Sequence, residues 1–531
     1  MYFLGDEKDE HKIHEGGDND RKAVFVPMNG NGAGFHDPSV GGRAAEACSV
    51  TGSSPDSVLV LDAGETHPFG VDAYTQPTMT ELPDQPPSPV KRAAPAEPIV
   101  FSRASRKKGF GRILRILGPG IVTGAADDDP SGIATYSQAG AQFAFGTLWT
   151  ILLTLPLMIA VQEACMRIGA VTGKGLAGVI RETYPKKVLF PIVALVAAAN
   201  TFNIGSDIGA MAASAQLLVP QVPFALLAIG FVAIILVLEV LVSYRSYVRV
   251  LKWLALALFA YLVTAFLITV PWAQALQATV VPHFEFTKDF FFVVVAIFGT
   301  TISPYLFFWQ TSNVVEDEVS ERRKDSTGGS PRISKNYLRR LRIDTVLGML
   351  FSNVVAWFII LVGAVVLNRG GVTNIVSAAD AASALRPLVH SFPHAGVLAQ
   401  LIFAVGVIGI GLMSIPVLAG STSYAITETF NWKEGLFLKF RQARAFYLVI
   451  ITGTLVGLLL NFVGLDPIKA LVLTAVFNGI VAVPLIFLIA RISSRRKLMR
   501  QYSSGIWSKI GLWVAFAVMG TAAIALLVSS L

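Results

Sequence analysis

Three consecutive aspartates followed by a proline stand inside an apolar stretch of the chain, where a charged side chain is costly. The run reads Asp127-Asp128-Asp129-Pro130-Ser131-Gly132. An ionised carboxylate at membrane depth marks a functional site by default. Successive residues of a helix point in different directions, so only one of the three can face a given site. We select Asp129, which adjoins the proline, and expect Asp127 and Asp128 to face an aqueous vestibule.

A second interruption, in a later apolar stretch, offers hydroxyl groups instead of charge. It reads Gly299-Thr300-Thr301-Ile302-Ser303-Pro304-Tyr305. Proline removes a backbone donor and clashes with the preceding turn, so each run predicts a broken helix. Inside a membrane, unwound backbone lines a cavity or is buried in protein. Free carbonyls, the Asp129 carboxylate and the hydroxyls of Thr300 and Ser303 would form an oxygen cage, which suits Mg2+, Ca2+ or Mn2+.

Long apolar segments must carry these two runs. Of 531 residues, 53% are hydrophobic and 15% are charged, against about 25% charged in an average soluble protein. A membrane-spanning helix needs about 20 apolar residues. Eleven segments qualify, which predicts an all-α integral membrane protein with about eleven spans. They lie at about 114–140, 146–171, 188–216, 223–244, 249–272, 289–315, 343–367, 396–426, 445–463, 467–491 and 508–530.

The two broken segments hold matching places if the segments form two repeats of five. The repeats would be residues 114–272 and 289–491, with 508–530 as an extra helix. Because five is odd, the second repeat starts from the opposite side of the membrane and is inverted. A proline kink would explain either break alone. Interrupted helices in corresponding positions instead favour a transporter site at the midplane.

The distribution of charge predicts the topology. With residues 1–100 in the cytoplasm, the inside connections hold 32 basic residues and the outside connections hold 4. This bias places the N-terminus inside and the C-terminus on the opposite side, in a plasma or inner membrane. Residues 1–100 carry a net charge of −9 and no long apolar run, which predicts a disordered acidic tail before a transmembrane domain at 101–531. The basic residues sit between apolar runs, so they indicate membrane topology and not nucleic-acid binding.

Two further polar residues stand within predicted spans. Asp207 is either an ion or proton relay or a partner for a neighbouring helix, and Asn478 lies where it could reach the central cavity. The sequence contains no nucleotide-binding loop, zinc motif or nucleophile elbow, which argues against an enzyme.

Several motifs resemble the Nramp family of divalent metal transporters over most of residues 111–495. The resemblance rests on Gly118-Pro119-Gly120, the acidic break, Ala134-Thr135, Arg167 to Lys174, and Ser206-Asp207-Ile208-Gly209. It implies a LeuT-type fold with inverted five-helix repeats and broken helices 1 and 6.

The resemblance also implies which positions bind the metal, and this chain departs at several of them. The family's D-P-G-N has its aspartate at Asp129 but Gly132 at the asparagine ligand. Its methionine ligand corresponds to Ser303. Other departures are Tyr305 and Gln310 at two histidine positions, Ala210 at a third-helix acid, and Ala475 at or near a tenth-helix glutamine.

These departures favour Mg2+ over softer metals. A thioether prefers transition metals, and a hydroxyl does not. Glycine in place of asparagine widens the site for Mg2+, which keeps several waters. The pattern is similar to the Nramp-related magnesium transporter branch. It predicts Mg2+ uptake, with Mn2+ also carried, at a site of Asp129, Thr300, Ser303, Gly132 and Asn478.

Loss of the histidines and the third-helix acid predicts transport without proton coupling. The alternatives are a proton-coupled Mn2+/Fe2+ transporter and a non-transporting metal-sensing membrane protein. An organic-solute transporter of the same fold is disfavoured for anionic substrates, because they would meet Asp129. The expected partners are the transported divalent ion and the lipid bilayer, with no resident cofactor. No residue pattern specifies an oligomeric state.

Overall fold

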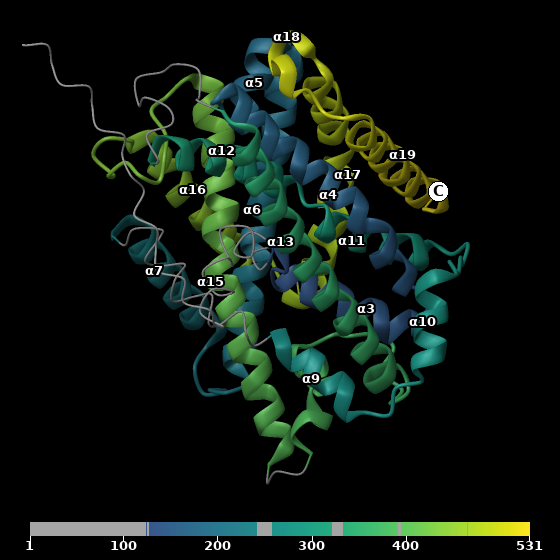
Figure 1. Cartoon of the computed structure of the whole chain (residues 1–531). Coiled ribbons are helices and arrows are strands. Elements are labelled where there is room, and N and C mark those ends of the chain that lie inside the picture. The colour runs from purple at the N-terminus through teal and green to yellow at the C-terminus, as the bar shows by residue number, and fades with distance from the viewer. Residues whose placement is uncertain are drawn as a thin grey trace, which may run out of the picture. The chain divides into compact units, whose positions relative to one another are not determined.

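The computed structural model describes residues 124, 127–241, 258–320, 333–390, 394–464 and 466–530. All regular elements in these ranges are helices, as Figure 1 shows. The first are α3 (Pro130–Phe143), α4 (Leu148–Thr172), α5 (Leu176–Thr183), α6 (Lys186–Gln216), α7 (Phe224–Leu241), α9 (Phe259–Leu267), α10 (Trp272–Val280), α11 (Lys288–Thr301) and α12 (Pro304–Ser320). The others are α13 (Lys335–Val362), η2 (Gly363–Asn368), α14 (Ala378–Ser383), η3 (Arg386–Val389), α15 (Ala395–Phe430), α16 (Arg444–Leu460), α17 (Pro467–Ser494), α18 (Arg496–Met499), η4 (Arg500–Tyr502) and α19 (Ile506–Ser529).

Seven of the helices in the described ranges are long and apolar enough to cross a membrane, by length and composition. They are α4, α6, α11 with α12, α13 with η2, α15, α17 and α19. The shorter apolar helices α7 and α16 fall on two further predicted segments. The predicted tail at 1–100 and the first half of the segment at 114–140 lie outside the described residues.

Several predicted connections contain short helices that the apolar pattern did not reveal. The segment predicted at 249–272 ends earlier, because α9 stops at Leu267 and α10 begins at Trp272, after Pro271. Proline suits the residue just before or at the first turn of a helix and disfavours helix in the residue ahead of it. Likewise, α5 separates α4 from α6, and α14 and η3 precede α15.

Both predicted helix breaks are present at their prolines. Helix α3 begins at Pro130, and Asp129 caps it by accepting a hydrogen bond from the Gly132 nitrogen. Helix α11 ends at Thr301, and α12 begins at Pro304 after an extended turn at Ile302. Proline is well tolerated as the first helical residue, and aspartate is a preferred N-cap, so Asp-Pro starts a helix on local grounds alone. The same pair, Asp466-Pro467, starts α17.

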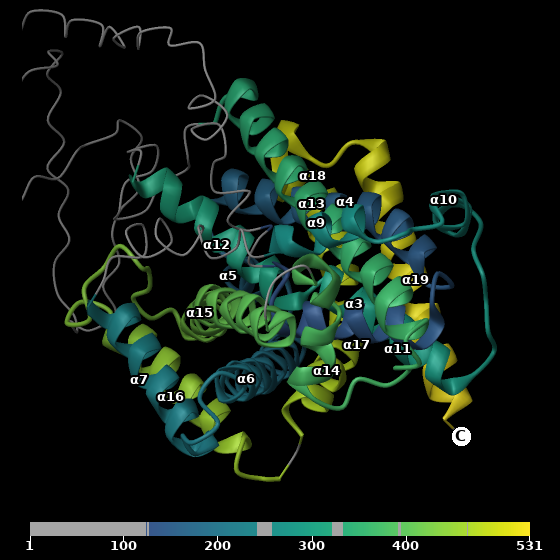
Figure 2. The ribbon, with the colours of Figure 1, turned by 90° about the horizontal axis from the view of Figure 1, so that it is seen from below.

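Helix α17 packs against both α3 and α11, the helices that adjoin the two breaks, and also against α6. The backbones of α17 and α11 approach closely at Gly299. A Cβ on Gly299 would overlap the Ala475 carbonyl oxygen and lie 2.8 Å from the Gly479 Cα. Figure 2 looks nearly along α6 and α15, which lie side by side, with α7 and α16 beyond them. The two breaks thus lie among long helices that are far apart in the sequence, such as α6 and α17.

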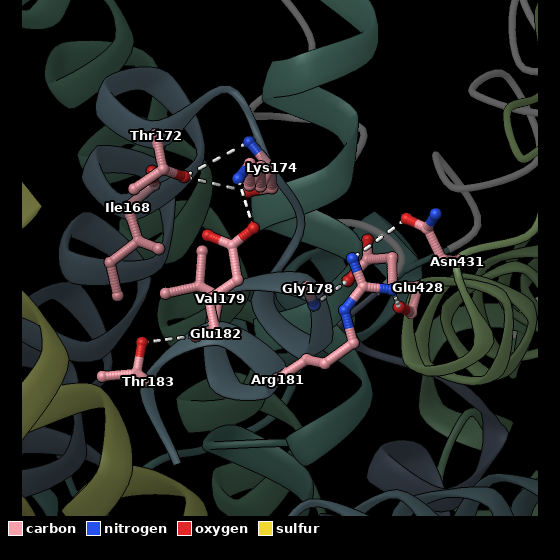
Figure 3. Close-up of polar contacts among 10 residues, drawn as sticks. All are labelled: Ile168, Thr172, Lys174, Gly178, Val179, Arg181, Glu182, Thr183, Glu428 and Asn431. Atoms are coloured by element: carbon pink, nitrogen blue, oxygen red, sulfur yellow. Dashed lines mark hydrogen bonds and ion pairs between the residues drawn. The ribbon is translucent and has the colours of Figure 1, made fainter. Parts of the chain in front are cut away.

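At the end of the domain where α5 lies, a buried carboxylate joins three helices. Glu428 of α15 accepts a hydrogen bond from the Gly178 nitrogen of α5 (2.9 Å) and another from the Ser312 hydroxyl of α12 (2.9 Å). Arg181 donates to the Glu428 main-chain oxygen and to the Asn431 side chain, as Figure 3 shows. These bonds tie α12, the second half of a broken helix, to the α4–α6 connection.

Candidate functional site

Asp129 is the centre of a buried polar cluster at the start of α3. Its side chain is 1% exposed. Oδ1 accepts hydrogen bonds from the Gly132 nitrogen (2.9 Å) and the Ser131 hydroxyl, and Oδ2 accepts one from the Asn203 amide of α6 (2.8 Å). Hydrogen-bond donors favour the charged form of a carboxylate. The chain therefore holds this group as an oriented acceptor in its interior.

The second break brings Thr300 to this cluster. The Thr300 hydroxyl lies 3.5 Å from the Ser131 hydroxyl, although the two residues are 169 positions apart. Gly132 faces the space between the breaks, since a Cβ there would lie 3.2 Å from Thr300 Oγ1 and 3.8 Å from Asp129 Oδ1. Asp129, Gly132 and Thr300, three of the predicted site residues, therefore lie together.

Ser303 lies at the second break, but its hydroxyl bonds to its own backbone. It donates to the Thr300 carbonyl (2.6 Å), with the Gly299 carbonyl at 3.1 Å. These are carbonyls that the helix break frees from their usual i+4 partners. The hydroxyl therefore caps the end of α11, and it competes for the carbonyl oxygens that we expected to face the ion.

The prediction of an aqueous vestibule at Asp127 and Asp128 is wrong for this structure. Both side chains are buried, with exposed fractions of 1% and 0%. The Ser352 hydroxyl of α13 lies 2.9 Å from Asp127 Oδ2 and 3.0 Å from Asp128 Oδ1. A hydroxyl has one hydrogen, so it can donate to only one of them at a time. The turn before α3 brings both carboxylates against α13, a tertiary contact that the local sequence does not specify.

Asp207 is fully buried on α6 and bonds to a neighbouring helix. Its Oδ2 accepts a hydrogen bond from the Ser414 hydroxyl of α15 (3.0 Å), while Oδ1 has no hydrogen-bond partner in the described ranges. Of the two predicted roles, the structure contains the helix-to-helix bond. The relay role stays a prediction. Asp207 lies one turn beyond Asn203 on the same face of α6, and so close to Asp129.

Asn478 is buried on α17, and neither polar atom of its side chain has a hydrogen-bond partner among the residues that the structure describes. Nearby on the same helix, Thr474 contacts Ser206 of α6 (3.3 Å) and the Ala475 carbonyl faces Gly299 of α11. Asn478 is thus in the helix that packs on both breaks, but no hydrogen bond joins it to Asp129, Thr300 or Ser303. Its predicted role as a ligand stays a prediction.

Four carboxylates, of Asp127, Asp128, Asp129 and Asp207, are therefore buried near the breaks. None of them forms an ion pair with a described basic side chain. Burying an unpaired negative charge is strongly unfavourable. Within the described residues, no three histidine, cysteine or acidic side chains converge as a metal cluster. The site thus combines one well-oriented carboxylate with neutral oxygens, and no cationic side chain of the described ranges pairs with it.

The sequence analysis missed Ser131, Asn203 and Ser352. Ser131 stands inside the Asp-Pro-Ser-Gly run, where serine commonly bonds to a nearby acceptor. Asn203 precedes Asp207 by four residues, the spacing that puts two side chains on one helix face. Ser131 and Asn203 could therefore have been identified from their sequence positions relative to Asp129 and Asp207. Ser352 had no such signal, because nothing near it in the sequence marks its partner.

The sequence of this chain is similar to a known protein family and to its members. The sequence profile of the family described as natural resistance-associated macrophage protein-like (Nramp) matches residues 120–529. A divalent metal cation transporter, MntH, of Caldanaerobacter subterraneus subsp. tengcongensis is 25% identical over 413 residues, covering 77% of this chain and 91% of that protein.

Solved structures share the fold. A histidine-to-alanine mutant of the Eremococcus coleocola manganese transporter superposes with a TM-score of 0.61 at 17% identity, over 80% of this chain and 88% of that one. MhsT in complex with L-phenylalanine superposes with a TM-score of 0.55 at 14% identity, over 81% of this chain and 99% of that one. These similarities confirm the predicted LeuT-type fold.

Proposed function

Because the chain belongs to the Nramp family, we propose that it carries divalent metal cations across a membrane, with Mg2+ as the favoured ion and Mn2+ as a second substrate. The observation that carries the proposal is that the four carboxylates near the broken helices are buried and form no ion pair with a basic side chain of the described residues. A cation arriving from water would supply the missing charge. The name of the MntH relative, a divalent metal cation transporter, supports this substrate class.

The donor atoms favour a hard cation. The atoms there that could bind a metal are the oxygens of the Asp129 carboxylate and of the Ser131 and Thr300 hydroxyls. The other groups that contact Asp129 are a main-chain N–H and an amide NH2, which only donate hydrogen bonds. Oxygen donors suit Mg2+, Ca2+ and Mn2+, whereas sulfur selects softer metals. Gly132 brings no side chain into the space beside Asp129, where a Cβ would already lie 3.2 Å from Thr300 Oγ1 and 3.4 Å from the Tyr136 ring. With no side-chain ligand at position 132, a bound ion would keep water at that position, as Mg2+ tends to do.

Competition uptake tests the selectivity. Purified protein in liposomes should admit Mg2+ and Mn2+, as reported by trapped indicators, and excess external Mg2+ should suppress Mn2+ uptake. Mn2+ uptake that is unaffected by a large excess of Mg2+ would contradict the magnesium proposal and favour an Mn2+/Fe2+ transporter. Wild-type vesicles that take up no divalent ion, although the protein is inserted and stable, would instead favour a metal-sensing protein.

Replacing Ser303 with methionine should raise the preference for Mn2+ over Mg2+ by about tenfold, or about 1.4 kcal/mol. The change adds a thioether at the second break and removes the hydroxyl that caps the Thr300 carbonyl. A thioether favours the softer metal. The switch should be incomplete, because Gly132 still supplies no side-chain ligand. The measurement is the ratio of Mn2+ to Mg2+ uptake in competition.

Ser303→Ala is the matched control, since it removes the same hydroxyl without adding sulfur. It should leave the Mn2+/Mg2+ ratio within about twofold of the wild-type value. If the methionine and alanine variants show the same ratio, the side chain at position 303 does not face the ion, and the selectivity has another source.

We further propose that transport does not carry protons. Ala210 and Tyr305 replace groups that could relay a proton, and Gln310 contacts Thr345 through its amide (3.4 Å). Asp207 remains as the main candidate carrier, and its Oδ2 already accepts from Ser414. Asp207 is the one acidic residue of α6, and we assign its acidic neighbour Asp129 to the ion, so the two do not form a separate proton path.

A pH indicator trapped in the liposomes checks this expectation while the membrane potential is clamped. An imposed inward Mg2+ or Mn2+ gradient should load the vesicles with metal and leave internal pH unchanged. Metal-dependent acidification that disappears in Asp207→Asn would restore the proton-coupled alternative.

A further inference from the structure

An asparagine from a helix remote from both breaks reaches the central carboxylate. Asn203 belongs to α6 and is fully buried. Its Nδ2 donates to Asp129 Oδ2 at 2.8 Å, the one hydrogen bond that this side chain makes within the described part of the chain. The amide therefore lies directly against the group that we place at the centre of the ion site.

The other end of this amide is unsatisfied. Asn203 Oδ1 is buried and has no hydrogen-bond partner among the described residues. Leaving such an acceptor unpaired costs about 1–3 kcal/mol, and a buried orphan in a native structure calls for an explanation. Because Oδ1 and Nδ2 share one amide carbon, Oδ1 is within a few ångströms of Asp129.

The space beside Asp129 is bounded by oxygens and, on one side, by the Tyr136 ring, whose nearest carbon would lie 3.4 Å from a Cβ on Gly132. Between Asp129 Oδ1 and Thr300 Oγ1 lies the position that a Cβ of Gly132 would fill. The Ser131 hydroxyl borders the same region. A divalent ion entering here would meet one carboxylate and two hydroxyls. Mg2+ and Ca2+ also accept amide carbonyl ligands of the asparagine type, and Asn203 offers one that nothing else uses.

We propose that Asn203 is a ligand of the transported divalent cation and a determinant of its affinity. The amide nitrogen orients Asp129, and the amide oxygen Oδ1 binds the ion. This assignment rests on the proposed function, because it requires a divalent substrate at the broken helices. It also gives α6 a direct part in binding, whereas the two breaks contribute Asp129 and Thr300.

Two substitutions separate the ligand role from a purely positioning role. Asn203→Ala removes both the donor and the oxygen, so the KM for Mg2+ should rise by at least about tenfold while the protein stays folded. Asn203→Asp also removes the donor to Asp129, but it keeps an oxygen of the same shape at Oδ1. The aspartate variant should therefore keep a KM within about threefold of the wild-type value, because a bound cation offsets the repulsion between the carboxylates.

Asn200→Ala is the matched control. Asn200 lies about one turn earlier on α6 and is equally buried, and its Nδ2 donates to Thr422 Oγ1 (2.9 Å) instead of Asp129. A general weakening of α6 packing would lower the stability and the maximum rate in both alanine variants. Only Asn203→Ala should raise the KM. The kcat, the KM for Mg2+ and Mn2+, and the melting temperature in detergent are measured for each variant.

The KM values of the two Asn203 variants decide between a ligand role and a positioning role. If Asn203→Ala and Asn203→Asp raise the KM equally, Asn203 acts only by positioning Asp129 and the ligand assignment is wrong. If neither variant changes the KM of an active transporter, Asn203 is remote from the ion. The ligand role is then wrong, and the proposed transport function still stands. Wild-type protein that moves no divalent ion would remove the proposed function, and the ligand role would fall with it.

Discussion

Replacing Asp129 with alanine should abolish divalent cation uptake while leaving the protein folded and inserted. The carboxylate is buried, receives three hydrogen bonds, and has Oδ1 3.8 Å from the position of a Cβ on Gly132, between the two breaks. Removing one partner of a buried charge pair costs about 3–5 kcal/mol. Such a loss corresponds to a fall in ion affinity of about 100-fold or more. Initial uptake rates of Mg2+ and Mn2+ in proteoliposomes measure it.

A second Asp-Pro pair in the same chain provides an unusually close control. Asp466 caps α17 as Asp129 caps α3, with Pro467 at the first helical position, but Asp466 is exposed. Asp466→Ala should remove a cap, at about 1 kcal/mol of stability, and leave uptake close to the wild-type rate. Equal uptake in the two alanine variants would show that Asp129 is only a helix cap and would refute the site assignment.

Adding a single methyl group at Gly299 should have the second largest effect. Gly→Ala in the middle of a helix normally stabilises a protein by about 0.5–1 kcal/mol. At Gly299 the substitution should instead lower the stability, because the new Cβ would overlap backbone atoms of Ala475 and Gly479 on α17. Overpacking of this kind costs about 1–3 kcal/mol. It also moves α11, whose end carries Thr300, away from Asp129.

Thermal unfolding in detergent and Mg2+ uptake check this reversal. Gly299→Ala should lower both the melting temperature and the uptake rate. Gly453→Ala, on α16, is the control, since a Cβ there meets nothing within 4 Å, and it should leave the melting temperature unchanged or slightly raised. If Gly299→Ala is as stable and active as the control, the contact between α11 and α17 is looser than the structure indicates.

The breaks were predictable from sequence because their causes are local. A proline fixes its own φ angle and lacks an N–H group, so Pro130 and Pro304 mark helix starts whatever surrounds them. The long apolar helices were predictable for a similar reason, since hydrophobic length alone identifies them. Their short companions α10 and α14 were missed because they fall between apolar runs and have no membrane-length signal.

The composition of the site was only partly predictable because it depends on packing between remote segments. Asp129 and Thr300 could be selected, since each stands at a break. Asn203 meets Asp129 only because α6 crosses the start of α3, and Ser352 meets the neighbouring aspartates only because α13 does so. Ser303 was expected to face the ion, yet its hydroxyl bonds to carbonyls of its own turn, a choice that serine makes locally.

Voltage-driven Mg2+ accumulation by the purified protein tests the central claim most directly. A divalent ion crossing about 100 mV gains roughly 4.6 kcal/mol, enough for an inward gradient on the order of a thousandfold. Liposomes with an inside-negative potential and a trapped Mg2+ indicator should therefore accumulate the ion well above its external concentration, and Asp129→Ala liposomes should not. Indistinguishable Mg2+ signals from wild-type, Asp129→Ala and protein-free liposomes would contradict the account.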